Sequence, residues 1–204
     1  MDKLLEGIIK FKREDFLKNR ELFSDLKDSQ KPHTLFITCS DSRIDPNLIT
    51  GSRPGDLFII RNIANIIPPF RETTEYVATT SGVEYAVLVL GVENIIVCGH
   101  SNCGGCAASL NGGKVIEGLP HTSKWLELLG EAKEKIAHSK DVEAREWMLE
   151  QANIVEQIKN LKSYPYIQEK LDQGELKISG WYYIIDTGEI YVFNEIDKEF
   201  QLSN

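Results

Sequence analysis

Two segments decide the fold, Thr34-Leu-Phe-Ile-Thr-Cys-Ser-Asp-Ser-Arg43 and Asn94-Ile-Ile-Val-Cys-Gly-His-Ser-Asn-Cys103. Each opens with a short apolar run that is typical of a buried strand and then turns polar. The first segment offers Cys39 and Asp41 where its strand ends, and the second offers His100 and Cys103. Ligands bind at the carboxyl ends of the strands in open α/β sheets. We therefore expect two thiols, an imidazole and a carboxylate at one edge of a sheet.

The rest of the chain predicts an α/β fold around these segments. A further strand is predicted at 56–60, after the turn Arg53-Pro-Gly55, and a helix at 80–90 that ends at Gly91. Because this helix is apolar on most faces, we expect it to be buried. Strand, crossover and strand in this order indicate a mostly parallel β-sheet flanked by helices. Later elements are helices over 123–138 and 142–161, and two strands around a tight turn, 176–185 and 190–193.

The first thirty residues read as a helical arm rich in charge. Leu4, Leu5, Ile8 and Ile9 fall on one stripe, and the segment ends at Gln30-Lys-Pro32. Such an arm has little to pack against within itself, so we expect it to lie on the domain or on a partner subunit. The 204 residues are predicted to form a single domain: the arm over 1–30, a metal-site core over 31–110, and helices and edge strands over 111–204.

Composition narrows the class of protein. A formal charge of −8 and a pI near 5.1 argue against a nucleic-acid or anionic-membrane partner. The most apolar region, 83–98, is interrupted by charges, so no membrane span is expected. The amino terminus shows no secretory signal, and the cysteines are clustered rather than spread as a disulfide framework. A cytoplasmic location with reduced thiols is the expectation.

Two thiolates and one imidazole are a known donor set for zinc. The two thiolates, of Cys39 and Cys103, would cancel the ion's two positive charges, and together with His100 they would leave a fourth position. Water on such a neutral centre ionises less readily, so a nearby base is useful, and Asp41 is suitably placed. Asp41 could instead fill the fourth position and close the site. Arg43 can pair with Asp41 and hold the carboxylate off the metal, which would make the pair a latch.

Plainer interpretations compete at several of these positions. Cys98, in an apolar run, is expected to be an ordinary buried thiol. Cys103-Gly-Gly-Cys106 could be a redox pair, and Asp41 could be a simple turn residue. The remaining histidines are expected to be solvated, and no glycine pattern indicates a nucleotide site. These histidines are His33, His121 and His138.

Taken together, the motifs resemble those of the β-class carbonic anhydrases, over about residues 10–195. The matching segments occur in the family's order and spacing. They are Cys39-Ser-Asp-Ser-Arg43, Arg61-Asn-Ile-Ala-Asn65 with Pro68-Pro69, Glu84-Tyr-Ala-Val87, and Cys98-Gly-His-Ser-Asn-Cys-Gly-Gly105.

The resemblance implies reversible hydration of carbon dioxide to bicarbonate and a proton by zinc-bound hydroxide. It implies one Zn²⁺ per chain on Cys39, His100 and Cys103. Asp41 and Arg43 would form the catalytic dyad, with Asp41 as the fourth ligand in a closed state. Alternatives are the same zinc fold acting on carbon disulfide or carbonyl sulfide, a redox protein, or a regulatory module with a vestigial zinc.

The resemblance also implies a substrate cleft at a subunit boundary, in a homodimer or a dimer of dimers. Its residues would be Gln30, Phe58, Tyr85 and Gly104. Some bacterial members bind inhibitory bicarbonate through a Trp, an Arg and a Tyr, and the matching positions here hold Phe36, Arg61 and Tyr183. Without the Trp we expect no strong bicarbonate inhibition. The family assigns no role to Cys106.

Overall fold

The structure is a computed structural model that describes residues 1–72, 77–112, 116–141 and 144–203. The chain divides into two compact units, Met1–Lys31 and Pro32–Asn204. Within the described residues, no helix combines the length and apolar character that crossing a bilayer requires.

The first unit is helical, as predicted. Helix α1 (Asp2–Lys10) continues through a π-helical turn η1 (Phe11–Asp15) into α2 (Phe16–Lys18), and α3 (Arg20–Leu26) follows. Three phenylalanine rings hold the unit together with centroids 5.4 to 6.2 Å apart. The apolar stripe of α1 is not covered by other residues of this unit. Its members, Leu4, Leu5, Ile8 and Ile9, are 51 to 69% exposed.

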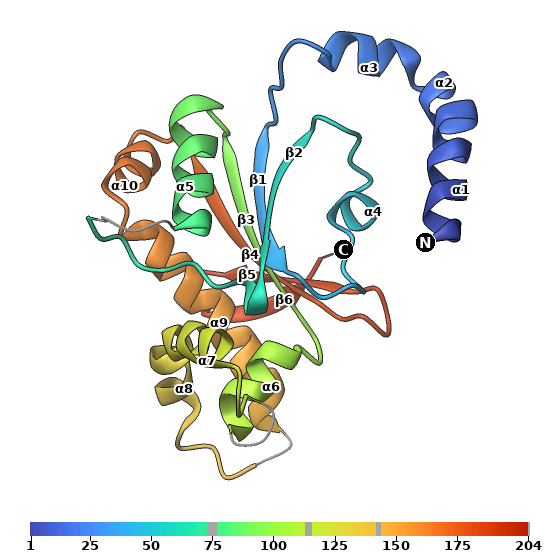
Figure 1. Ribbon diagram of the computed structural model, residues 1–204. Helices are drawn as coiled ribbons and strands as arrows, with labels where there is room; N and C mark the ends of the chain where they lie inside the picture. The colour runs from blue at the N-terminus through green and yellow to red at the C-terminus, as the bar shows by residue number, and fades with distance from the viewer. Residues whose placement is uncertain (73–76, 113–115, 142–143, 204) are drawn as a thin grey trace. The chain divides into compact units, whose positions relative to one another are not determined.

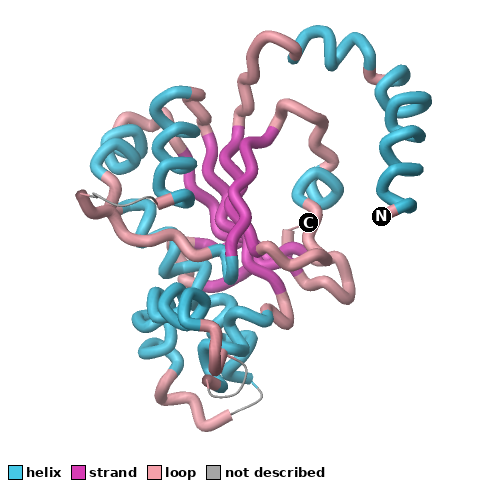
Figure 2. Tube along the Cα trace, viewed as in Figure 1, coloured by secondary structure: helices cyan, strands magenta, loops and turns pink. Residues whose placement is uncertain are grey.

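The second unit is built on one six-stranded sheet of order β2-β1-β3-β4-β5-β6 (Figures 1 and 2). The first four strands in this order run parallel, whereas β5 and β6 are antiparallel additions. The parallel core confirms the predicted fold class, and β6 was not predicted. The strands are β1 (Thr34–Cys39), β2 (Leu57–Asn62), β3 (Asn94–His100), β4 (Lys177–Tyr183), β5 (Ile190–Asn194) and β6 (Glu199–Leu202).

Helices connect and cover these strands. The predicted helix at 123–138 is divided into α7, η5 and α8, and the predicted helix at 142–161 is α9, with residues 142 and 143 outside the described part. Helices α4 and α10 were not predicted. The helical elements are α4 (Pro46–Thr50), η2 (Ile63–Asn65), α5 (Ala78–Glu84), η3 (Tyr85–Val89), α6 (Gly104–Asn111), α7 (Pro120–Leu126), η5 (Glu127–Leu129), α8 (Gly130–Ile136), α9 (Ala144–Lys162) and α10 (Pro165–Asp172).

The helix at 80–90 is the clearest correction. We expected it to be buried, but Tyr85, Leu88 and Val89 are 45, 53 and 64% exposed. Its other side, with Val83 and Ala86, packs into the main core against the sheet. One face of a helix can cover a sheet, and no described element of the second unit covers the other face. The apolar composition of this helix therefore reflects an uncovered surface as well as a core.

Helix α9 packs on β3 and β4 at very short range. A Cβ atom added to Gly99 or to Gly180 would lie 2.8 Å from side-chain carbons of Ile154. Real Cβ atoms do not approach that closely, so the absence of side chains at these positions lets α9 lie directly on the strands. As a result, polar side chains of α9 can reach the carboxyl end of β3.

Candidate metal centre

Three predicted ligands converge at the carboxyl ends of two neighbouring strands. Cys39 is the last residue of β1, His100 is the last residue of β3, and Cys103 is the N-cap of α6. Their ligand atoms all lie within 4.8 Å of one another. The three residues are 5, 1 and 2% exposed. The parallel pairing of β1 with β3 produces this meeting, because it aligns the strand ends.

The imidazole is oriented as a ligand. Nδ1 of His100 lies 3.0 Å from the carbonyl oxygen of Ser101, which only accepts, so Nδ1 carries the proton. Nε2 then presents a lone pair. It is buried and has no hydrogen-bond partner among the described residues. A buried ring nitrogen with a free lone pair, turned toward two thiols, fits a metal ion.

The two thiols need a cation before both can ionise. Their Sγ atoms are 4.0 Å apart. The pKa of Cys39 is raised to about 12, first by its hydrogen bond with Cys103 and then by burial. The pKa of Cys103 is also raised to about 12, first by its hydrogen bond with Cys106. Metal ions bind thiolates and displace these protons, and an S, N, S donor set suits zinc.

Asp41 is held by Arg43 in a bidentate pair. Arg43 donates from Nε to Oδ1 at 2.9 Å and from Nη2 to Oδ2 at 2.7 Å, and its backbone N–H donates to Oδ1 at 3.0 Å. These hydrogen bonds lower the pKa of Asp41, and those from the Arg43 side chain have the largest effect. Oδ2 remains 3.9 Å from Nε2 of His100. The carboxylate is therefore anionic and lies beside the three ligands.

Arg61 supports the same loop from β2. Its Nε donates to the carbonyl oxygen of Cys39 at 3.1 Å, and its Nη2 donates to that of Asp41 at 2.6 Å. Phe36 is fully buried, with its ring edge-on to Trp181 at 5.9 Å. From the sequence, Arg61 was part of a matching segment and had a role only in a second anion site, so its hydrogen bonds to the ligand loop are visible only in the structure.

A cavity of about 330 Å³ opens beside the ligands. Cys39, Asp41 and Gly104 line it, together with apolar walls that include Ile63 and Leu126. Gly104 thus lies where the resemblance implied. Its missing side chain leaves open space, because an added Cβ would meet nothing within 4 Å.

The other predicted cleft residues are not part of this cavity. Phe58 and Tyr85 pack against each other with ring centroids 6.1 Å apart, and neither lines it. Gln30 is exposed and belongs to the first unit. Within one chain, the structure therefore brings Gly104 to the metal ligands but leaves Phe58 and Tyr85 apart from the cavity.

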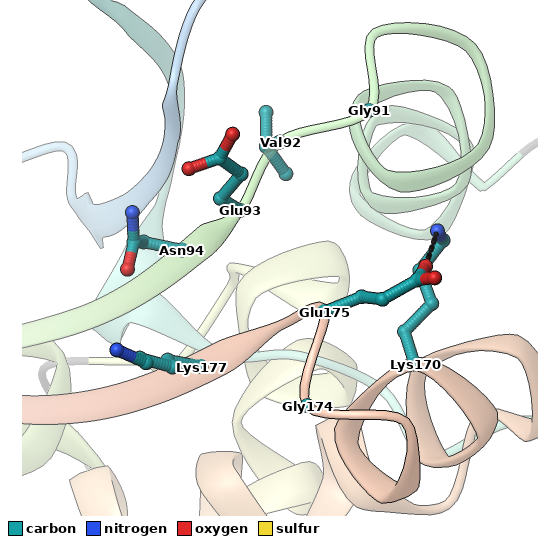
Figure 3. A pocket seen from close by; sticks show the side chains of 8 residues that line it. All are labelled: Gly91, Val92, Glu93, Asn94, Lys170, Gly174, Glu175 and Lys177. Atoms are coloured by element: carbon teal, nitrogen blue, oxygen red, sulfur yellow. Dashed lines mark hydrogen bonds and ion pairs between the residues drawn. The ribbon is translucent and has the colours of Figure 1, made fainter.

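A separate hollow of about 460 Å³ lies at the opposite end of the sheet (Figure 3). Asn94 and Lys177, the first residues of β3 and β4, line it, and Lys170 forms an ion pair with Glu175 at 3.0 Å. Its lining carries both signs of charge and contains no cysteine or histidine. We therefore assign the chemistry to the Cys39 end.

The competing interpretations of single residues are mostly resolved. Cys98 is fully buried, and burial raises its pKa to about 12, as expected of a structural thiol. Cys103 and Cys106 are free thiols. Cys106 packs in the cluster of buried residues that also contains Cys39 and Cys103. The remaining histidines, His33, His121 and His138, are exposed, as expected.

Comparison with known proteins agrees with this centre. The family model described as "Carbonic anhydrase" matches residues 34–190. A carbonic anhydrase of Helicobacter pylori is 43% identical over 92% of this chain and 88% of its own, and one of Synechocystis is 40% identical over 98 and 73%. The solved structure of the β-carbonic anhydrase CcaA has 39% identity and a TM-score of 0.92, covering 100 and 99% of the two chains. A structure described as a tetrameric β-carbonic anhydrase of Sordaria macrospora has 33% identity and a TM-score of 0.83, covering 95 and 96%.

Proposed function

Because the chain belongs to the β-carbonic anhydrase family, we propose that it hydrates carbon dioxide reversibly to bicarbonate and a proton, using one zinc ion. The observation that carries the proposal is the convergence of Cys39, His100 and Cys103 within 4.8 Å. A zinc ion bound by these donors would supply a Lewis acid that lowers the pKa of water.

The chain's own residues would prepare the reaction around that ion. The carboxylate of Asp41 can orient water and accept its proton, and Arg43 keeps the carboxylate anionic and off the three ligands. The apolar wall near Ile63 suits an uncharged linear substrate. If the pair with Arg43 opened, Asp41 would be close enough to become the fourth ligand, since Oδ2 already lies 3.9 Å from His100.

We further propose that a second copy of the chain completes the cleft, in a homodimer or a dimer of dimers. Phe58 and Tyr85 form an aromatic pair outside the cavity of their own chain. Tyr85 belongs to the uncovered face with Leu88 and Val89, and Phe58 is on β2, an edge strand of the sheet. This arrangement supports donation of both rings to a neighbouring cavity. Gln30 is proposed to reach the cleft from the arm.

We also propose a cytoplasmic location and carbon dioxide as the preferred substrate. Four free cysteines support a reducing compartment, in agreement with the expected cytoplasmic location. Carbon dioxide is preferred to carbon disulfide or carbonyl sulfide as substrate because the relatives described above are named carbonic anhydrases. The convergence of Cys103 with Cys39 and His100 favours metal binding over a redox function at Cys103.

The first test measures zinc content and the rate of carbon dioxide hydration by stopped flow. The parent is expected to hold about one zinc per chain and to be active, because three donors converge. Cys39→Ala and His100→Ala are expected to lose both zinc and activity. Cys98→Ala is the matched control, since it removes a buried thiol outside the ligand set and is expected to keep the zinc. If Cys39→Ala and His100→Ala retained zinc as the control does, the assignment of ligands would be refuted.

The second test separates Asp41 from the ligands. Asp41→Ala is expected to retain zinc but to lose about 100-fold in kcat, which is the typical contribution of a positioned base. Asp45→Ala is the control, because Asp45 caps α4 through the backbone N–H groups of Asn47 and Leu48 and does not touch the cluster. A variant without Asp41 that is as fast as the parent would contradict the proposed dyad.

A further inference from the structure

Helix α9 contributes a buried carboxylate, Glu150, that the proposed reaction does not use. The residue is 3% exposed and makes no ion pair within the described part of the chain. A buried carboxylate is costly unless specific hydrogen bonds satisfy its oxygens. Its contacts therefore indicate what it is for.

Both oxygens of Glu150 are engaged at short distances. Oε1 accepts the backbone N–H of Cys103 at 2.7 Å, and Oε2 accepts the hydroxyl of Tyr182 at 2.6 Å. Cys103 is the N-cap of α6, and the preceding Asn102 has a φ of 56°, in the left-handed region. The ligand thus sits on a tight, strained turn, and Glu150 ties the peptide of that turn to α9 and to β4.

Glu150 is the first of a polar stripe along one buried face of α9. Asn153 donates to the carbonyl oxygen of Ala64 at 2.9 Å, and Gln157 accepts the N–H of Ile67 at 2.6 Å. Asn160 donates to the carbonyl oxygen of Ile67 at 2.9 Å. These side chains hold the segment after β2 that supplies a wall of the cavity. One rigid helix therefore fixes both the wall and the Cys103 turn.

We propose that Glu150 is a positioning residue for the metal centre, which holds Cys103 in the geometry that binds the ion. The proposal rests on the proposed function, because it requires Cys103 to be a ligand. Removing the acceptor leaves a buried N–H unsatisfied and loosens the turn that carries the thiolate, which then keeps the hydrogen bond from Arg43 to the carbonyl oxygen of Asn102 at 3.0 Å. Partners that orient metal ligands typically change metal affinity by 10- to 100-fold.

The test measures the rate at which the zinc-loaded protein releases its metal to an excess of a chromophoric chelator. Glu150→Ala is expected to release zinc at least tenfold faster than the parent. Glu150→Gln is expected to stay within about threefold, because an amide oxygen still accepts the N–H of Cys103. Tyr182→Phe, which keeps that same bond, is expected to resemble Glu150→Gln.

Glu156→Gln is the matched control, since Glu156 is also a buried glutamate of α9 but pairs with Lys135 and Lys159. It is expected to lower the melting temperature without changing zinc release. Glu150→Asp serves if Glu150→Ala does not fold, because a side chain shorter by one methylene group cannot reach both partners. The cobalt-substituted Glu150→Asp variant is expected to have a visible spectrum shifted from that of the parent. It is also expected to release its metal about tenfold faster than the parent.

The outcomes separate the two proposals. A parent that binds no zinc would refute the proposed function. A parent that binds zinc, with folded Glu150→Ala or Glu150→Asp releasing it at the parent's rate, would overturn the positioning role alone. Equal acceleration in Glu156→Gln would also overturn it, because general loosening of α9 would then explain the effect.

Discussion

Two glutamates of α9 are buried to nearly the same extent but have different partners. Glu150 is 3% exposed and Glu156 is 2% exposed. Glu150 accepts hydrogen bonds from an amide and a phenol, whereas Glu156 accepts them from Lys135 at 2.6 Å and Lys159 at 3.1 Å. Burial raises the pKa of Glu150 on balance. Burial has the same tendency at Glu156, but the two lysines outweigh it and lower the pKa.

This lowered pKa predicts how stability depends on pH. The unfolded carboxyl titrates near 4.5, and the folded one below that value. The contribution is therefore fully present above about pH 4.5 and is lost as the pH falls through the folded pKa. Glu156→Gln is expected to be less stable than the parent by about 1–3 kcal/mol at pH 7. That difference should shrink as the pH is lowered from 6 to 3, as measured by urea unfolding.

The control for this experiment is Glu131→Gln, because Glu131 pairs with Lys159 at the exposed surface. Exposed ion pairs contribute little, so its difference from the parent is expected to be small at every pH. A loss in Glu156→Gln that stayed constant between pH 6 and 3 would show that packing, and not charge, explains the effect.

Single residues differ in how far the sequence reveals them. The convergence of Cys39, His100 and Cys103 was predictable, because these residues follow two apolar runs and the carboxyl ends of neighbouring parallel strands lie side by side. Glu150 was not, because its helix is rich in Glu and Lys and resembles a solvated surface. A usable signal was present in the spacing of Glu150, Asn153, Gln157 and Asn160. They recur at helical intervals on the same face as the apolar positions.

At the scale of elements, the contact between α9 and the sheet determines the site. Gly99 lies between Cys98 and His100 in β3, and Gly180 lies in the neighbouring strand β4, opposite Val97. Side-chain carbons of Ile154 lie 2.8 Å from the position that a Cβ atom would take at either glycine. A larger residue at either position would push α9 outward, away from the turn that it holds.

Gly99→Ala is therefore expected to destabilise the protein by about 1–3 kcal/mol, the usual cost of overpacking a core. Chemical denaturation measures this cost directly. The double variant Gly99→Ala with Ile154→Ala is expected to lose less stability than the sum of the losses in the two single variants, because Ile154→Ala removes the atoms that clash. Strict additivity would show that the clash is not the cause.

Gly130→Ala is the control for this element. Gly130 begins α8, and an added Cβ there would meet nothing within 4 Å. Alanine at such a site usually stabilises a helix slightly, by about 0.4–1 kcal/mol. A comparable loss in both variants would indicate that α9 does not depend on the close approach.

The strands and helices differ in how well the sequence predicts them. The parallel strands were predicted within a few residues, since β1, β2 and β3 each contain a compact apolar run and β4 is rich in aromatic residues. The helix at 80–90 was wrongly expected to be buried because composition does not tell which apolar face meets its own chain. Helix α4 is short, yet Asp45-Pro46 is a capping signal that could have revealed it.

At the scale of the whole molecule, two apolar surfaces have no cover among the described residues of their own unit. One is the stripe of α1, and the other is the face with Tyr85, Leu88 and Val89. Exposed apolar patches on soluble proteins usually mark contacts with other molecules. Both fit the proposal that the protein works as a symmetric assembly.

The arm provides the test of this proposal. Leu5→Glu combined with Ile8→Glu is expected to weaken association at least tenfold, because two large apolar side chains would no longer be buried. Sedimentation velocity over a dilution series measures the shift toward smaller species. Lys3→Ala is the control, since it changes the same helix at an exposed polar position. An unchanged distribution of mass in the double variant would exclude the stripe from the interface.

The order of the strands also constrains the path by which the chain matures. Cys39 and Cys103 are 64 positions apart, and β1 must lie beside β3 before their sulfurs can meet. A slip of one residue in that pairing would turn the cysteine at the end of β1 to the other side of the sheet. Because closing so long a stretch of chain is entropically costly and slow, we expect these strands to pair before an ion can bind all three ligands. Metal loading should therefore report that folding has already succeeded, and nascent or misregistered chains should remain metal-free.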